Sequence, residues 1–186
     1  MPPKARITKE EIVQAGLMVV RREGENGLNA RNIAALLGCS TQPIFSNYAS
    51  MEDLRRAVIA AAAEVYTQYI AQEVASGVYP EYKASGIAYI RFAREEKNLF
   101  RLLYMRDRGN REEPYEAQMF GEMGNFVRDY VGLEIDRARL FHLEMWTFVH
   151  GLATMMATGY LELDMEMVSM MMTDAYLGIK HRFEKE

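Results

Sequence analysis

Apolar side chains recur at helical spacing along almost the whole of this 186-residue chain, and no run alternates between apolar and polar residues as a half-buried strand would. The five prolines lie at or near places where a helical segment could begin, and a missing backbone N–H is tolerated there. Apolar residues make up 49% of the sequence, which is enough for a sizeable buried core. The pattern therefore predicts an all-α fold.

Charge is unevenly distributed along the chain, although the formal net charge is only −4. Residues 1–56 carry eight Lys and Arg against six Asp and Glu, whereas residues 57–186 carry fourteen against twenty. If the protein binds a polyanion, the contact is therefore expected near the N-terminus.

The cysteine content and the longest apolar stretch both indicate the cellular compartment of the protein. The one cysteine, Cys39, excludes an intramolecular disulfide framework and suits a reducing compartment. No charged segment followed by an apolar stretch opens the chain, and the apolar stretch at residues 143–161 contains Glu144 and His150. We therefore expect a cytoplasmic protein with no membrane partner.

Capping signals divide the first 75 residues into three short helices and one long helix. Thr8-Lys9-Glu10-Glu11 forms a capping box, and Asn29 can cap a second helix that ends at Gly38. Ser40 can cap a third helix that runs to about residue 47, and Ser50 can open a fourth toward residue 74. Further helices are expected at about 81–96, 98–108, 115–131, 136–160 and 164–183.

Residues 30–48 have the anatomy of a helix-turn-helix, whose second helix would enter a major groove. The sequence reads LNARNIAALLGCS at residues 28–40, PIFSNY at 43–48 and MEDL at 51–54. These segments, with the helix before them, resemble the DNA-binding domain of the TetR family over residues 8–56. The resemblance implies a helix-turn-helix domain at residues 1–56, followed by a helical ligand-binding and dimerisation domain at residues 57–186.

The polar face of the third helix supplies the candidate base contacts. Gln42 and Asn47 can pair with adenine, hydroxyl groups can serve bases or phosphates, and the ring of Pro43 can touch a thymine methyl group. Basic residues at the N-terminus and on the second helix are candidates for phosphate or minor-groove contacts. The complete set is Lys4, Arg6, Arg31, Thr41, Gln42, Pro43, Phe45, Ser46, Asn47 and Tyr48.

Two residues depart from the common family pattern. Phe45 stands where the family often has a tyrosine that reaches a phosphate, and Met51 stands where it often has a lysine. We expect operator affinity to depend more on the N-terminal arm and on backbone amides, with a smaller salt dependence.

The rest of the chain resembles one TetR subgroup. The sequence WTFVHGLA at residues 146–153 is similar to its Trp…His-Gly signature, and YIRFA at 89–93 with NLFRLLY at 98–104 is similar to its earlier helix pair. The resemblance implies that the last two long helices form a four-helix bundle with a second subunit. Small residues that suit such packing are Gly151, Ala153, Ala157, Gly159 and Gly178.

In the family, the ligand lies inside the helical body, between the fourth helix and the later ones. Methionine and aromatic side chains there would suit an apolar or aromatic small molecule with a few polar groups. The candidate lining residues are Tyr66, Tyr69, Phe92, Phe100, Tyr104, Phe120, Met123, Trp146 and His150.

Together these features predict a ligand-released repressor that binds a palindromic operator in double-stranded DNA as a homodimer. No cofactor, metal site or enzymatic activity is expected, since no catalytic set appears at motif spacing. His142 and His150 are eight residues apart, which favours packed or hydrogen-bonded histidines over metal ligands. The alternative is an all-α adaptor protein that kept the fold but lost operator recognition, a reading that Phe45 and Met51 motivate.

Overall fold

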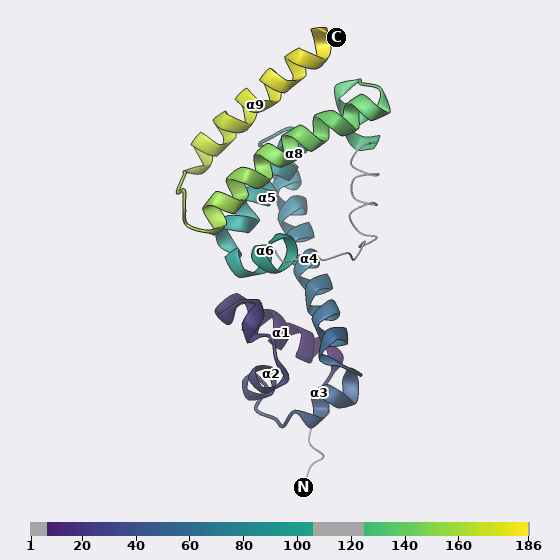
Figure 1. Cartoon of the computed structure of the whole chain (residues 1–186), viewed down its shortest axis with the longest axis vertical. Coiled ribbons are helices and arrows are strands. Elements are labelled where there is room, and N and C mark those ends of the chain that lie inside the picture. The colour runs from purple at the N-terminus through teal and green to yellow at the C-terminus, as the bar shows by residue number, and fades with distance from the viewer. Residues whose placement is uncertain (1–6, 106–124, 186) are drawn as a thin grey trace. The chain divides into compact units, whose positions relative to one another are not determined.

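The structure is a computed structural model that describes residues 7–105 and 125–185, and no strand occurs within these residues. The all-α prediction is confirmed. The elements, shown in Figure 1, are α1 (Lys9–Glu23), the short 3₁₀ turn η1 (Glu25–Gly27), α2 (Ala30–Leu36), α3 (Gln42–Asn47), α4 (Met51–Ser76), α5 (Glu81–Glu95), α6 (Lys97–Tyr104), α8 (Ile135–Ala157) and α9 (Met165–Lys185). Residues 125–131 are also helical, while the first ten residues of the helix expected at 115–131 lie outside the described residues.

Side-chain caps fix the starts of three helices where the sequence predicted them. At α1, the Thr8 hydroxyl accepts from the Glu11 amide at 3.1 Å, and the Glu11 carboxylate accepts from the Thr8 amide at 2.8 Å. The Asn29 carbonyl oxygen accepts from the amide of Asn32 at 3.0 Å. The Ser50 hydroxyl accepts from the amide of Asp53 at 3.1 Å. Each bond satisfies a backbone donor that the first turn of a helix leaves unpaired.

The start of α3 differs from the prediction. Thr41, not Ser40, occupies the N-cap position, and its side chain makes no capping bond. The reason lies in the turn before it. Gly38 adopts φ +63°, the left-handed conformation that glycine tolerates best, and the Cys39 amide donates to the Ala34 carbonyl at 3.0 Å. The turn therefore extends through Ser40, and α3 begins at Gln42.

By compactness the described chain divides into two units, of which the first comprises residues 7–68 and 95–105. Its core contains fully buried side chains from α1, α2, α3 and α4, and α1 packs against both α2 and α6. The core residues include Ile12, Ile33, Ile44, Leu54 and Val58. Helices α2 and α3 of the helix-turn-helix therefore share a core with α1 and α4, and α6 packs against α1.

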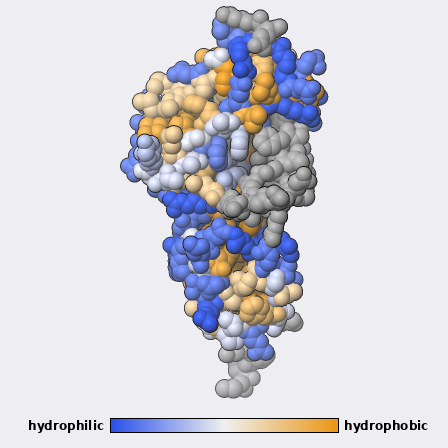
Figure 2. Space-filling view, viewed as in Figure 1, coloured by the Kyte–Doolittle hydropathy of each residue, from blue (hydrophilic) through white to orange (hydrophobic). Residues whose placement is uncertain are grey.

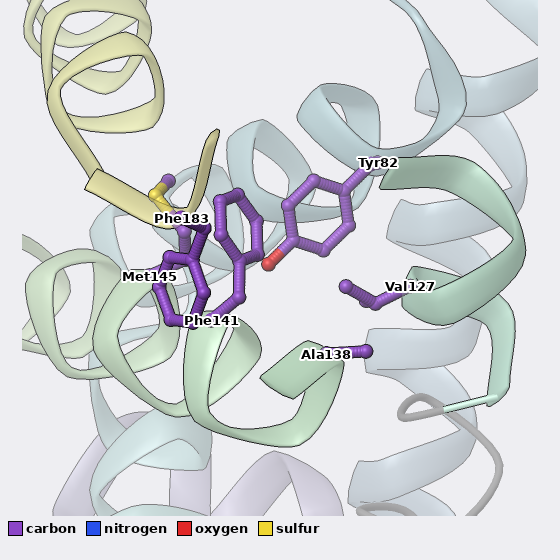
Figure 3. Packing of buried hydrophobic residues seen from close by; sticks show 6 residues of the cluster. All are labelled: Tyr82, Val127, Ala138, Phe141, Met145 and Phe183. Carbon is purple, nitrogen blue, oxygen red and sulfur yellow. The ribbon is translucent and has the colours of Figure 1, made fainter. Parts of the chain in front are cut away.

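The second unit comprises residues 69–94 and 125–185. Here α9 lies alongside α8 (Figure 1), and α5 contributes to the same core. Figure 3 shows the aromatic centre of this core, where Phe141 of α8 lies between Tyr82 of α5 and Phe183 of α9. The rings of Phe141 and Phe183 meet edge to face at 5.7 Å between centroids, an arrangement that aromatic pairs favour.

The two units divide α4 after Gln68 and divide the chain again after Arg94. They are defined by packing, whereas the sequence-based division at residues 56 and 57 follows function and stays a prediction. Within residues 7–105 and 125–185, no helix combines the length and the apolar character that a membrane span requires. The same residues contain no group of His, Cys, Asp and Glu side chains that could hold a metal ion.

Candidate nucleic-acid interface

Helix α3 has one fully buried side chain and turns most of its other side chains outward. Ile44 is fully buried, whereas Gln42, Phe45 and Ser46 are exposed. The remaining predicted contacts on this segment, Thr41, Pro43, Asn47 and Tyr48, are half-buried. Arg31 of α2 is also exposed, while Lys4 and Arg6 lie outside the described residues.

Asn47 is tied into the protein by its side-chain amide. Its Nδ2 donates to the Pro43 carbonyl at 2.8 Å and to the Ile7 carbonyl at 3.4 Å. A bidentate contact with adenine needs an N–H from the same nitrogen. Asn47 would therefore have to give up one of these bonds to read a base, and in its present position it links α3 to the start of the described chain.

Ser46 also uses its donor within α3. Its hydroxyl donates to the Gln42 carbonyl at 2.9 Å, one helical turn earlier, and keeps only its acceptor capacity for a ligand. Gln42 is thus the exposed amide side chain on α3 that is best placed to make a bidentate base contact.

Tyr48 closes α3, because its amide donates to the Ile44 carbonyl at 2.9 Å. The ammonium group of Lys9 lies 5.5 Å from the centroid of its ring. Burial raises the pKa of the Tyr48 hydroxyl, and the charge of Glu10 adds to the effect. The hydroxyl therefore stays protonated at neutral pH and can donate to a phosphate oxygen.

Several basic residues of the first unit are engaged in ion pairs. Arg21 binds both carboxylate oxygens of Glu96, with its closest contact at 2.8 Å, and Arg55 pairs with Glu25. Arg56 pairs with Asp53. Arg31 makes no ion pair with any described residue, so its guanidinium is available for a phosphate.

The predicted ligand-lining residues fall into both units. In the first, Tyr104 meets Tyr66 edge to face at 6.1 Å and Phe100 at 5.2 Å between ring centroids. In the second, Tyr69 meets Phe92 at 5.5 Å, and Trp146 stacks on His150 at 4.9 Å. Phe120 and Met123 lie outside the described residues.

Sequence reasoning missed the tyrosine partners of two half-buried histidines, His142 and His150. The Tyr89 hydroxyl lies 2.9 Å from His150 Nδ1, and the Tyr82 hydroxyl lies 3.0 Å from His142 Nδ1. The prediction of hydrogen-bonded histidines is therefore confirmed. Tyr82 and Tyr89 are seven residues apart, so they share one face of α5, and this spacing could have indicated a common partner helix.

A partly buried ion pair was also missed. Arg91 Nη1 of α5 lies 2.7 Å from Glu73 Oε2 of α4, and Glu73 is only 8% exposed. The Arg91 guanidinium also lies 5.4 Å from the ring centroid of Tyr69. The two contacts join the last turns of α4 to α5, and nothing in a single sequence indicates which of its many charged residues will be paired inside.

Comparisons with known proteins agree with this architecture. Residues 82–176 match the family described as tetracyclin repressor-like, C-terminal domain. The chain is 24% identical over 161 residues to an uncharacterised HTH-type transcriptional regulator of Mycobacterium tuberculosis H37Rv, covering 85% of this chain and 74% of that protein. It has the fold of a crystallised candidate transcriptional regulator from Pseudomonas aeruginosa PAO1, with a TM-score of 0.71 at 14% identity, over 97% of this chain and 95% of that one.

A helix-turn-helix on an all-α body defines a class of DNA-binding regulators. The chain belongs to the TetR family, and it is a transcriptional regulator of that type.

Proposed function

We propose that this regulator is a ligand-released repressor that binds a palindromic operator as a homodimer. The observation that carries the proposal is the exposed face of α3, where Gln42, Phe45 and Ser46 point outward while Ile44 anchors the helix. In a helix-turn-helix, the second helix lies in the major groove and presents such residues to base edges. Arg31 on α2 would contact the phosphate backbone beside them.

Apolar residues on α8 and α9 support the dimer. Six large apolar side chains on these helices are more than two-fifths exposed, namely Leu140, Leu143, Met155, Met167, Met170 and Leu177. Figure 2 shows apolar side chains among polar ones over this part of the chain. Association with a second copy would remove them from water, as in family dimers. The two recognition helices would then lie about 34–36 Å apart, one turn of duplex.

Small residues divide into three groups by their surroundings. A Cβ atom added at Gly151 or Gly178 meets nothing within 4 Å, so both positions leave room beside the helix for a partner. Ala153 and Ala157 are fully buried within the chain and therefore pack inside the protomer rather than against a second copy. Gly159 adopts φ +72° after the end of α8 and serves the turn there.

The contacts of α6 suggest how ligand binding would change the position of the DNA-binding helices. Besides the Arg21–Glu96 pair, the Asn98 amide donates to the Arg21 carbonyl at 2.9 Å, so α6 is fastened to the last turns of α1. Phe100 and Tyr104 are on the same helix. An apolar or aromatic ligand that displaced these rings would move α6, and α1 would follow because the two helices are joined.

The proposed function is tested by selecting genomic DNA fragments with the purified protein and measuring mobility shifts on the enriched sequence. A two-fold symmetric site should bind more tightly than the same site with one half scrambled, because the dimer would lose one recognition helix. Gln42→Ala should weaken this preference, and Val78→Ala, a change between α4 and α5, serves as the matched control. Equal affinity for the selected site and for bulk DNA would contradict operator recognition and would favour the adaptor function.

Ligand release is tested with the same site. Apolar and aromatic compounds that raise the thermal stability of the protein should lower its operator affinity. If every stabilising compound left operator affinity unchanged, the ligand-release part of the proposal would be wrong.

A further inference from the structure

Phe45 is an unusual side chain to leave in water on a helix that faces a major groove. It is 52% exposed, although the next residue toward the N-terminus, Ile44, is fully buried and fixes the helix. A phenyl ring carries no hydrogen-bond donor, so it cannot bind a phosphate oxygen as a tyrosine hydroxyl can. Its favourable contacts must therefore be apolar.

The neighbours of Phe45 offer few hydrogen bonds to a base. The Ser46 hydroxyl donates to the Gln42 carbonyl, and the Asn47 amide donates to the Pro43 and Ile7 carbonyls. Gln42 and Phe45 are three residues apart on α3, so their side chains are neighbours on one helix face. The exposed face of α3 thus pairs one amide side chain with one aromatic ring.

This pairing matches the chemistry of an A·T base pair in the major groove. Glutamine binds adenine through its N6 and N7 atoms, and the C5-methyl group of thymine is the apolar group that the major groove displays. G·C pairs lack this methyl group. An exposed ring beside an exposed amide therefore fits a short A·T-containing step better than a G·C step.

We propose that Phe45 is a specificity-determining residue that packs against the C5-methyl group of a thymine in each operator half-site, next to an adenine bound by Gln42. The inference rests on the proposed operator binding and deepens it. Burying one methyl group corresponds to about a fourfold gain in affinity, so two half-sites together give about fifteenfold.

The test uses the full-length protein and its selected operator, in which each thymine is replaced in turn by deoxyuridine. This replacement removes the methyl group and leaves every hydrogen-bonding group in place. The wild-type protein should lose about fourfold in affinity at one thymine position per half-site and about fifteenfold when both symmetric positions are changed. Phe45→Ala should bind the thymine operator less tightly and show no further loss with deoxyuridine at that position.

The Pro43→Ala variant is the matched comparison, because its ring also lies on α3 and would contact a methyl group at a different position. Its sensitivity to deoxyuridine at the Phe45 position should equal that of the wild-type protein. Equal sensitivity of Phe45→Ala and wild type at every position would overturn the inference, as would a wild-type protein insensitive to all deoxyuridine substitutions. With either of these two outcomes the protein would still prefer its operator over other DNA. A wild-type protein that showed no such preference would instead contradict the proposed operator binding.

Discussion

The half-buried His142 and the buried Tyr82 form a neutral hydrogen-bonded pair that makes stability depend on pH. Burial lowers the pKa of His142 from its ordinary value of 6.5 to about 4, and burial also raises the pKa of Tyr82. A neutral imidazole can accept the Tyr82 hydroxyl at Nδ1, 3.0 Å away. Between pH 6.5 and 4 the unfolded chain therefore binds a proton that the folded chain does not.

The first prediction follows from this difference. The free energy of unfolding should fall by up to about 3 kcal/mol as pH drops from above 6.5 to about 4. His142→Phe should flatten this dependence, because the variant has no group at this position to protonate. Urea titrations at several pH values measure the effect, and the exposed His181→Phe is the control. A pH dependence identical in His142→Phe and wild type would contradict the assignment.

A second prediction contrasts two helical glycines. A Cβ atom at Gly16 would lie 2.6 Å from Val58 Cγ2, across the contact of α1 with α4, whereas one at Gly151 meets nothing within 4 Å. Valine has few accessible rotamers, so Gly16→Ala should destabilise the protein by about 1–3 kcal/mol despite its better helix propensity.

Gly151→Ala gains that propensity, about 1 kcal/mol, without a clash inside the protomer. The two variants should therefore shift the urea midpoint in opposite directions, measured at several protein concentrations to separate folding from association. A stabilising Gly16→Ala would mean that α1 and α4 do not approach as closely as described.

At the scale of single elements, α6 is attached to α1 by side chains that are partly exposed. The bidentate Arg21–Glu96 pair and the Asn98 bond to the Arg21 carbonyl are the attachments. Glu96→Ala should therefore lower stability by less than about 1 kcal/mol, because exposed ion pairs contribute little. Local motion should change more than global stability.

Hydrogen exchange measured by mass spectrometry tests this third prediction. In Glu96→Ala, amides of α6 should exchange faster, while amides of α9 should be unchanged, because local opening depends on local contacts. Glu64→Ala, an exposed change on α4, is the matched control. Unchanged exchange in α6 would show that Phe100 and the other buried residues hold the helix without the polar attachments.

Helix starts show which parts of the fold could be read from one sequence. Thr8, Asn29 and Ser50 act through backbone groups three residues away, and all three caps were predicted. The start of α3 was misplaced because it depends on the geometry of the turn after Gly38. A helix start could therefore be predicted from the sequence where it depends on a side chain and a backbone group three residues apart.

In the candidate site, too, local features could be predicted from the sequence and long-range contacts could not. The polar composition of α3 is visible in the sequence, and so is the substitution at Phe45. The internal bonds of Asn47 reach Ile7, forty residues earlier, and the Tyr82–His142 contact joins residues sixty apart. Such contacts depend on tertiary packing, so one sequence does not indicate them. The bonds of Asn47 change which side chains of α3 remain available for DNA.

At the scale of the whole molecule, the proposed dimer depends on apolar residues that the protomer leaves in water. Leu143 of α8 is 46% exposed and Leu177 of α9 is 57% exposed. If both are buried between two copies, placing a carboxylate at each would put like charges into a desolvated interface. The double change Leu143→Glu and Leu177→Glu should therefore give a monomer that keeps its helical circular dichroism spectrum.

The affinity for the operator should fall when the dimer is lost. Two recognition helices joined in one particle bind both half-sites with an effective concentration that a monomer lacks, so affinity for the full site should drop at least about 100-fold. Val78→Glu adds one such carboxylate at a 68% exposed residue outside α8 and α9, and it should remain dimeric and bind normally. Sedimentation velocity and mobility shifts on the same samples connect the two effects. A double variant that is monomeric yet binds the full site with wild-type affinity would separate DNA binding from dimerisation, whereas one that remains dimeric would move the interface away from Leu143 and Leu177.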